Sequence, residues 1–170
     1  MSVSVRNAVA GDSERVAAMV AELAASEGKP AGAFSAAHFR RDGFGPAARF
    51  GCLVAERDGT VVGYASYYPA YDMATPSHGL HLLDLFVAPD ARRSGVGTAL
   101  MRAVGERCRR RGGQWLSLHV LPRNAGARVF YERLGAEDLG LAFLAVEGVA
   151  LANLVPDRTR PASPGGPTSA

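Results

Sequence analysis

The feature that most constrains the fold is a buried strand that leads, through a loop containing two glycines, directly into a helix. Residues 80–87 are almost entirely apolar, which is typical of a strand covered on both faces. From about 95 to 111, apolar residues recur at helical spacing. Gly95 and Gly97 allow backbone N–H groups to point toward one spot without obstruction by Cβ atoms. The segment therefore predicts a helix packed on a sheet, with an anion-binding cradle at the helix N-terminus.

The other elements are predicted by alternation, turn residues and helix caps. We expect a strand over 3–6, a helix capped by Asp12 or Ser13 and ending near 28–30, a short helix over 35–41, a hairpin of 52–56 and 60–68, a strand over 115–121, and a helix from Asn124 to Gly135. Short apolar segments then complete a single domain over residues 1–155. Residues 156–170, which are rich in Pro, Gly, Ser and Thr, predict a disordered tail.

Composition argues against several classes of protein. The chain has 170 residues, 48% of them hydrophobic, which suits one compact domain. Its formal net charge of +3 is small, so a nucleic-acid role has little support. Cys52 and Cys108 lack the spacing of a metal site, and no apolar run reaches the ~20 residues that span a bilayer. The N-terminus does not resemble a signal peptide. We expect a cytoplasmic protein without metal, membrane or nucleic-acid partner.

Two motifs carry the chemistry. The loop reads RRSGVG from Arg92, where arginines beside the cradle suit a pyrophosphate, although a short Gly-x-Gly can also be a simple tight turn. The later helix reads NAGARVFYERLG from Asn124. Together the motifs resemble those of the GNAT acetyltransferase superfamily, Gln/Arg-x-x-Gly-x-Gly/Ala and Asn-x-x-Ala-x-x-x-Tyr-x-x-x-Gly. The resemblance implies α/β/α layers, with helices flanking a mixed, mostly antiparallel central sheet.

By that resemblance, the chain is an N-acetyltransferase that uses acetyl-CoA. The pyrophosphate would lie on the loop, the pantetheine arm would pair with the preceding strand, and Tyr131 would be the general acid. The cofactor residues implied in this way are Leu85, Phe86, Val87, Arg92, Arg93, Ser94, Gly95, Val96, Gly97, Thr98, Asn124, Ala127 and Tyr131. From the residues alone, Asn124 could equally be only a helix cap and Tyr131 only a packed aromatic.

The segments GFGPAARFGCLVAE and VGYASYYPAYD further resemble the spermidine/spermine and thialysine acetyltransferase branch. That branch has Leu-Glu-Asp where this chain has Leu82-Leu83-Asp84, so the glutamate that usually acts as base is missing. His81 and Asp84 are the candidates to replace it, and either could instead be purely structural. Strand alternation predicts His81 on the face of Leu83 and Asp84 on the opposite face.

The implied substrate residues are Glu27, Tyr71, Asp72 and Asp84, which match acidic and aromatic positions of the branch. His119 is predicted to be a packed or rim residue. The acceptor would be a small-molecule amine such as a diamine, a polyamine or an amino-acid-like amine. The alternatives are an aminoglycoside or protein amine, or a non-catalytic acyl-CoA sensor, which the absence of the glutamate keeps open. The branch and the apolar stretch between Leu141 and Val155 also suggest a homodimer.

Overall fold

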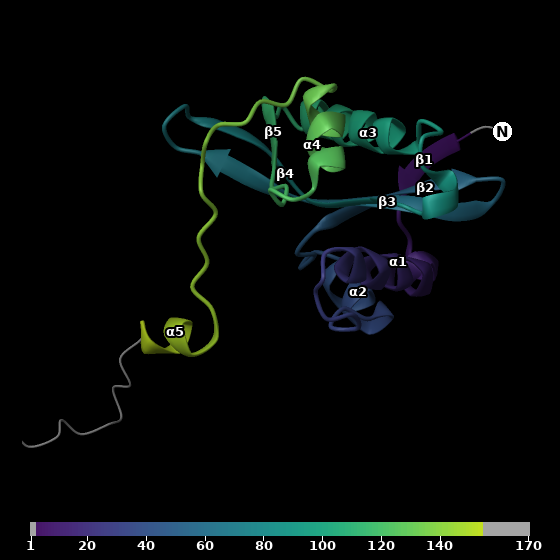
Figure 1. Cartoon of the computed structure of the whole chain (residues 1–170), viewed down its shortest axis with the longest axis horizontal. Coiled ribbons are helices and arrows are strands. Elements are labelled where there is room, and N and C mark those ends of the chain that lie inside the picture. Colours follow the sequence, from purple (N-terminus) through teal and green to yellow (C-terminus); the bar gives the residue numbers. More distant parts are fainter. Residues whose placement is uncertain (1–2, 155–170) are drawn as a thin grey trace, which may run out of the picture. The chain divides into compact units, whose positions relative to one another are not determined.

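The computed structural model describes residues 3–154 (Figure 1). The chain divides into two compact units, Met1–Pro122 and Arg123–Ala170. The first unit contains β1 (Val3–Asn7), α1 (Ser13–Ser26), α2 (Ala36–Asp42), β2 (Gly51–Arg57), β3 (Thr60–Asp72), β4 (Ser77–Val87), α3 (Val96–Arg110) and β5 (Trp115–Leu118), with short 3-10 turns at Ala10–Asp12 and Pro89–Ala91. The second contains α4 (Ala125–Glu132) and α5 (Gly148–Asn153). The predicted tail, 156–170, lies outside the described residues.

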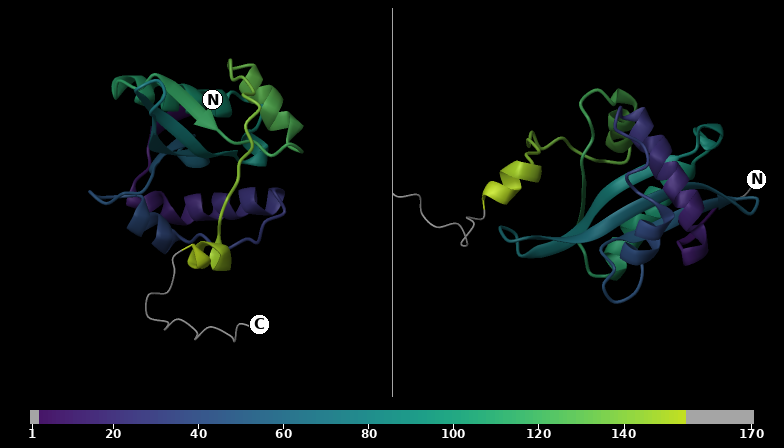
Figure 2. Two further views of the ribbon diagram at one scale, coloured as in Figure 1. Left: turned by 90° about the vertical axis from the view of Figure 1, so that its left-hand side faces the viewer. Right: turned by 90° about the horizontal axis from the view of Figure 1, so that it is seen from below.

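The first unit is a five-stranded sheet with helices on both faces. The strand order follows the sequence, β1-β2-β3-β4-β5, and all neighbours are antiparallel except the parallel pair β4 and β5. Helices α1 and α2 cover one face, and α3 covers the other (Figure 2). These layers confirm the predicted α/β/α arrangement around a mixed, mostly antiparallel sheet. The strand predicted over 115–121 is shorter than expected and ends at Leu118.

The core on the α1 side joins the two helices to the middle of the sheet. Val16 and Met19 of α1, Phe39 of α2, and Val54 and Tyr64 of the hairpin are each at most 1% exposed. The first two are three residues apart, as expected for one face of a helix. Each such burial contributes roughly 1.5–3 kcal/mol, so this layer fixes α1 and α2 on the sheet.

On the opposite face, α3 approaches the sheet closely because β3 carries a glycine there. A Cβ at Gly63 would lie 2.8 Å from a backbone oxygen of β4 and 3.3 Å from the side chains of Val96 and Leu100. The buried stripe of α3 continues with Val104 and Cys108, at intervals of four residues. The start of α3 is therefore held firmly at the end of β4.

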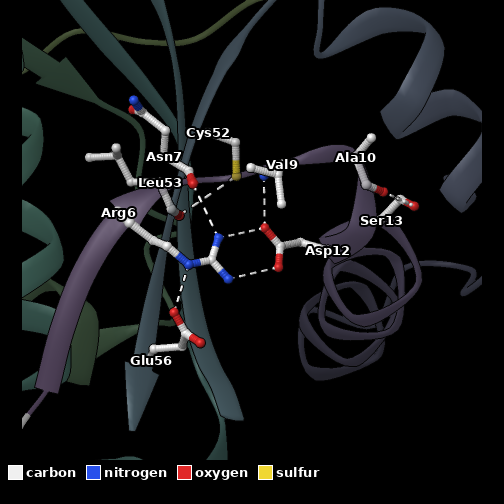
Figure 3. A network of polar contacts seen from close by, with 9 residues as sticks. All are labelled: Arg6, Asn7, Val9, Ala10, Asp12, Ser13, Cys52, Leu53 and Glu56. Carbon is white, nitrogen blue, oxygen red and sulfur yellow. Dashed lines mark hydrogen bonds and ion pairs between the residues drawn. The ribbon is translucent and has the colours of Figure 1, made fainter. Parts of the chain in front are cut away.

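A polar network fixes β1 to the start of α1 (Figure 3). The guanidinium of Arg6 donates to both carboxylate oxygens of Asp12, at 2.8 and 3.0 Å, and its Nε donates to Glu56 at 2.6 Å. The backbone N–H of Val9 also donates to Asp12, at 2.8 Å. Hydrogen bonds from Arg6 hold the pKa of the nearly buried Asp12 carboxyl below its ordinary value. The network satisfies charges that would be costly to bury alone.

Candidate active site

The central feature of the site is a bulge in β4. Along the pairing with β3, Tyr67 lies opposite Leu82 and Ser66 lies opposite Asp84, so Leu83 has no cross-strand partner. The extra residue restarts the alternation of side chains, since residues directly opposite each other share a face. His81 and Asp84 therefore lie on the same face of the sheet, the face covered by α1. The prediction that they lie on opposite faces was wrong.

Beyond the bulge, β4 has no partner strand on the β5 side among residues 3–154. The two strands pair only over Gly79–Leu82 of β4 and Trp115–Leu118 of β5. From Leu83 to Val87, no strand of the described chain pairs with β4 on that side. A backbone edge of this length can accept an extended ligand in the manner of an added strand. Leu85, Phe86 and Val87, the predicted contacts of a pantetheine arm, all lie in this segment.

The cradle was predicted in the loop after β4, and the geometry of this loop is compatible with it. Arg93 and Gly95 have left-handed backbone conformations, with φ of 59° and 86°, and Gly95 caps α3. The first N–H groups of the helix, from Val96 to Thr98, have no acceptor within the helix itself. A Cβ built on Gly95 would meet no atom within 4 Å, so the space beside the cap is open. Open space and N–H groups at the positive end of a 15-residue helix suit a phosphate-bearing group.

Arg92 and Ser94 shape this loop by bonding back to it. The Nε of Arg92 donates to the carbonyl of Val87 at 3.0 Å, and its guanidinium lies 5.7 Å from the ring centroid of Phe86. The hydroxyl of Ser94 donates to the carbonyl of Ala91 at 2.7 Å. Arg92 is thus held at the junction between the strand and the cradle, where a cation can attract an anionic ligand.

On the α1 face, Asp84 lies among hydroxyl groups. Tyr64 and Ser66 each approach one of its carboxylate oxygens to 3.4 Å. Burial raises the pKa of Asp84, and the carboxylate of Glu27 raises it further, while Lys29 has the opposite effect. Lys29 itself forms an ion pair with Glu27 at 2.6 Å. The predicted residues Glu27 and Asp84 therefore belong to one acidic cluster.

His81 lies beside this cluster and is only 7% exposed. Its Nδ1 is 2.8 Å from the hydroxyl oxygen of Ser117 on β5. Its ring centroid lies 5.1 Å from that of Tyr68 and 4.6 Å from that of His119. Burial lowers the pKa of His81, and the nearby His119 lowers it further. At neutral pH this imidazole is uncharged and able to accept a proton.

The other two predicted substrate residues are not brought to this cluster. Tyr71 and Asp72 end β3, five and six residues beyond Ser66, which corresponds to a separation of roughly 16–20 Å along the strand. Tyr71 is largely exposed. Asp72 accepts hydrogen bonds from the backbone N–H of Ala74 and the hydroxyl of Thr75, at 2.8 and 2.7 Å, and these bonds lower its pKa. In the first unit, Asp72 stabilises the turn between β3 and β4.

The second unit carries the remaining predicted residues on α4. The side-chain oxygen of Asn124 accepts a hydrogen bond from the backbone N–H of Ala127 at 3.1 Å, which confirms the predicted N-terminal cap. Tyr131 follows one turn after Ala127 on the same helical face. Its ring packs against Phe130 with centroids 5.2 Å apart.

Sequence reasoning missed three hydroxyl groups of the site. Tyr64 and Ser66 alternate with apolar residues along β3 and end on the α1 face, and Ser117 does the same on β5. Polar residues at a spacing of two within an otherwise apolar strand are a signal that could have identified them. Their functional meaning depends on the residues opposite, which only the strand register reveals.

The remaining observations concern Cys52, metal ligands and membrane-spanning helices. Burial raises the pKa of the Cys52 thiol to about 12, so it is a poor nucleophile at neutral pH. Among residues 3–154, no group of three or more His, Cys, Asp or Glu side chains could hold a metal ion. In the same range, no helix has the length and apolar character needed to cross a membrane.

Comparison with known proteins connects the site to a family. Residues 17–136 match the model of the acetyltransferase (GNAT) family. The thialysine N-epsilon-acetyltransferase of Bos taurus is 34% identical over 146 residues, which cover 81% of this chain and 85% of that protein. The protein of the same name from Sus scrofa is 35% identical over 147 residues, with coverages of 81% and 86%.

Solved structures agree on the fold. An integron cassette protein of V. cholerae has a TM-score of 0.75 and 23% identity, covering 91% of this chain and 98% of its own. An aminoglycoside acetyltransferase from an uncultured soil metagenomic sample, in complex with sisomicin, has a TM-score of 0.71 and 17% identity, covering 86% and 97%. At these identities the likeness shows the fold alone.

Proposed function

The chain belongs to the GNAT family of acetyltransferases and is an acetyl-transferring enzyme, and we propose that its acceptor is a primary amine of a small cationic molecule. The candidates are a diamine, a polyamine or an amino-acid-like amine. The observation that carries the proposal is the acidic cluster of Asp84 and Glu27 on the α1 face, at the bulge of β4. Two carboxylates attract an ammonium group, and the adjacent His81 can take its proton.

GNAT enzymes use acetyl-CoA as co-substrate, and the chain offers residues that fit it. The open cradle at Gly95 suits the pyrophosphate, and the unpaired edge from Leu83 to Val87 suits the pantetheine arm. When bound, acetyl-CoA supplies the thioester that is the acetyl donor. We propose that Arg92 to Thr98, Leu85 to Val87, Asn124 and Ala127 hold it.

Residues of the chain would then transfer the protons of the substrate amine and of the leaving thiolate. An alkylammonium has a pKa near that of lysine, about 10.4, so it must lose a proton before it can act as a nucleophile. In the proposed mechanism, Asp84 orients the ammonium, His81 accepts its proton, and Tyr131 donates a proton to the departing thiolate. Since Cys52 is a poor nucleophile, the amine attacks directly and no acyl-enzyme forms.

The test is continuous release of free thiol from acetyl-CoA across a panel of amines, including diamines, thialysine, aminoglycosides and lysine peptides. Turnover with small diamines or amino-acid-like amines is expected. If acetyl-CoA binds tightly but no amine causes thiol release, the protein is a sensor. That alternative arises because Leu83 replaces the glutamate of the branch. Preference for a peptide or an aminoglycoside would move the acceptor to another class.

Tyr131→Phe tests the proposed acid directly. It should lower kcat by about 100-fold or more with little change in acetyl-CoA affinity, because one positioned proton donor is lost. His81→Ala is the companion variant and should lose activity mainly below pH 8, since free amine becomes plentiful at higher pH. If neither substitution changes turnover on the best amine, the catalytic assignment is wrong.

We also propose a homodimer, as in the sequence-based expectation. The segment that follows α4 is rich in large apolar residues, including Leu141 and Phe143. Light scattering should give about twice the 17.8 kDa mass of the chain. A monomer at micromolar concentration would contradict this proposal.

A further inference from the structure

We propose that Ser117 and His119 complete the base, with Ser117 fixing the tautomer of His81 and His119 carrying the abstracted proton to solvent. This inference rests on the proposed function, since it concerns the same amine site. Neither residue belongs to a motif that the family resemblance assigned. Ser117 lies in the part of β5 that pairs with β4, and His119 follows directly after the end of β5.

The position of Ser117 follows from the strand register. In the parallel pairing, His81 of β4 lies opposite Ser117 of β5, and Nδ1 lies 2.8 Å from the serine oxygen. When Nδ1–H donates to this oxygen, Nε2 keeps its lone pair and can accept a proton. In this proposal Ser117 is a positioning residue that accepts from Nδ1–H, so that Nε2 is the basic atom.

His119 lies two residues after Ser117 and its ring contacts that of His81, with centroids 4.6 Å apart. His81 is buried, whereas His119 is exposed. The two imidazoles thus link the interior of the site to solvent. The substrate ammonium gives one proton to Nε2 of neutral His81, His81 passes it to His119 directly or through one water, and His119 releases it to solvent. The net change is an ammonium converted to a free amine, with both rings restored.

Groups from three elements face His81, and its burial favours movement of the proton outward. Tyr68 faces it from β3 with a ring separation of 5.1 Å, Asp84 lies on the same face of β4, and Glu27 of the acidic cluster comes from the end of α1. Burial, and then the neighbouring His119, lower the pKa of His81. A proton on His81 is therefore less stable than one on a solvated imidazole.

The role of Ser117 can be tested without turnover. The chain has only four histidines, so ¹⁵N NMR of the imidazoles can report the tautomer of each. Wild type should show His81 with the proton on Nδ1. Ser117→Ala should shift it toward the Nε2–H form, and Ser117→Thr should restore it. His78→Gln is the matched control, because His78 is exposed and bonds the carbonyl of Arg111 instead. An unchanged His81 tautomer in Ser117→Ala overturns the assignment of Ser117.

The role of His119 needs the reaction. At pH 7, in a buffer that carries protons poorly, His119→Ala should turn over about 10-fold more slowly than wild type, and added imidazole should restore the rate. His78→Gln should match wild type in both conditions. A His119→Ala rate that equals wild type without imidazole, or that imidazole does not raise, overturns the relay. If wild type acetylates no amine at all, the proposed function is wrong, and the relay is wrong with it. The NMR experiment on Ser117 does not depend on turnover, so it tests the assignment of Ser117 separately.

Discussion

The two halves of β4 show how one strand divides stability from chemistry. Before the bulge, residues 79–82 pair with both β3 and β5, and their side chains are fixed by close neighbours. After it, residues 84–87 pair with β3 alone, and Leu83, at the bulge itself, is 48% exposed. The paired half gives the sheet its rigidity, whereas the half with the free edge leaves backbone groups and Asp84 available to ligands. The bulge at Leu83 is therefore the boundary between these two tasks.

The largest effect is expected from Gly79→Val in the paired half. A Cβ at this position would lie 2.3 Å from the backbone oxygen of Trp115 and 2.4 Å from its ring, and neither β4 nor β5 can move without losing their pairing. We expect a loss of at least ~4 kcal/mol of unfolding free energy, which would leave little folded protein. Urea denaturation measures it, and a wild-type midpoint would show that β5 is not needed to fix this half.

Alanine at the two residues that flank the boundary should give opposite results. Leu82 is 3% exposed and Leu83 is 48% exposed. Leu82→Ala should cost ~2–5 kcal/mol through lost burial and a cavity. Leu83→Ala should change stability by less than ~0.5 kcal/mol. Denaturant unfolding of both variants measures these changes. Equal losses of unfolding free energy would contradict the proposed boundary at Leu83.

Gly97→Arg tests the ligand side of the comparison. The added side chain would cover the N–H groups in the first turn of α3, and we expect acetyl-CoA affinity to fall at least ~100-fold, or about 2.7 kcal/mol. Stability should change little. Glu106→Arg adds the same side chain at an exposed position of α3 and should bind as wild type does. Titration calorimetry measures the acetyl-CoA affinity of each variant. Unchanged affinity in folded Gly97→Arg would show that the cradle does not bind acetyl-CoA.

The smallest effect is a gain in stability from Asp84→Asn. Because burial raises the folded-state pKa of Asp84, this carboxyl stabilises the fold at acid pH, and that contribution is lost as pH rises through the folded pKa. At pH 7 the neutral asparagine should therefore raise stability slightly, while activity falls. The advantage should vanish below pH 4 in thermal melts. A variant less stable than wild type at pH 7 would show that Asp84 serves structure as much as chemistry.

The sequence predicted most elements, including the loop that turns into α3, but not the arrangement of His81 and Asp84. Helical spacing and glycine positions are local signals, and they located α3, its N-terminus and the β2–β3 hairpin within a few residues. Whether His81 and Asp84 lie on the same face depends on a bulge in β4. The bulge arises from the register between β3 and β4, so the sequence of β4 alone does not reveal it. Ser117 was missed for the same reason, since its partner belongs to another strand.

Similarity to the spermidine/spermine and thialysine acetyltransferase branch did not predict where Tyr71 and Asp72 lie. Their residue types match the branch, yet β3 carries them roughly 16–20 Å beyond Ser66. Residues of the same type as in the branch can still lie far from the site when the strand that carries them extends beyond it. Within the first unit, these residues end the β3–β4 hairpin rather than joining Asp84.

The network of Arg6, Asp12 and Glu56 has a consequence for the order in which the protein opens (Figure 3). β1 is an edge strand, and the bond from Arg6 to Glu56 spans 50 residues, so closing this loop costs more entropy than forming the neighbouring hairpin. Backbone amides of β1 should consequently exchange with deuterium before those of β3. The stabilisation from Asp12 is complete above its unfolded pKa and is lost as pH falls through its depressed folded value. Acid therefore releases β1 early and exposes the edge of β2, where two molecules can pair and begin to aggregate.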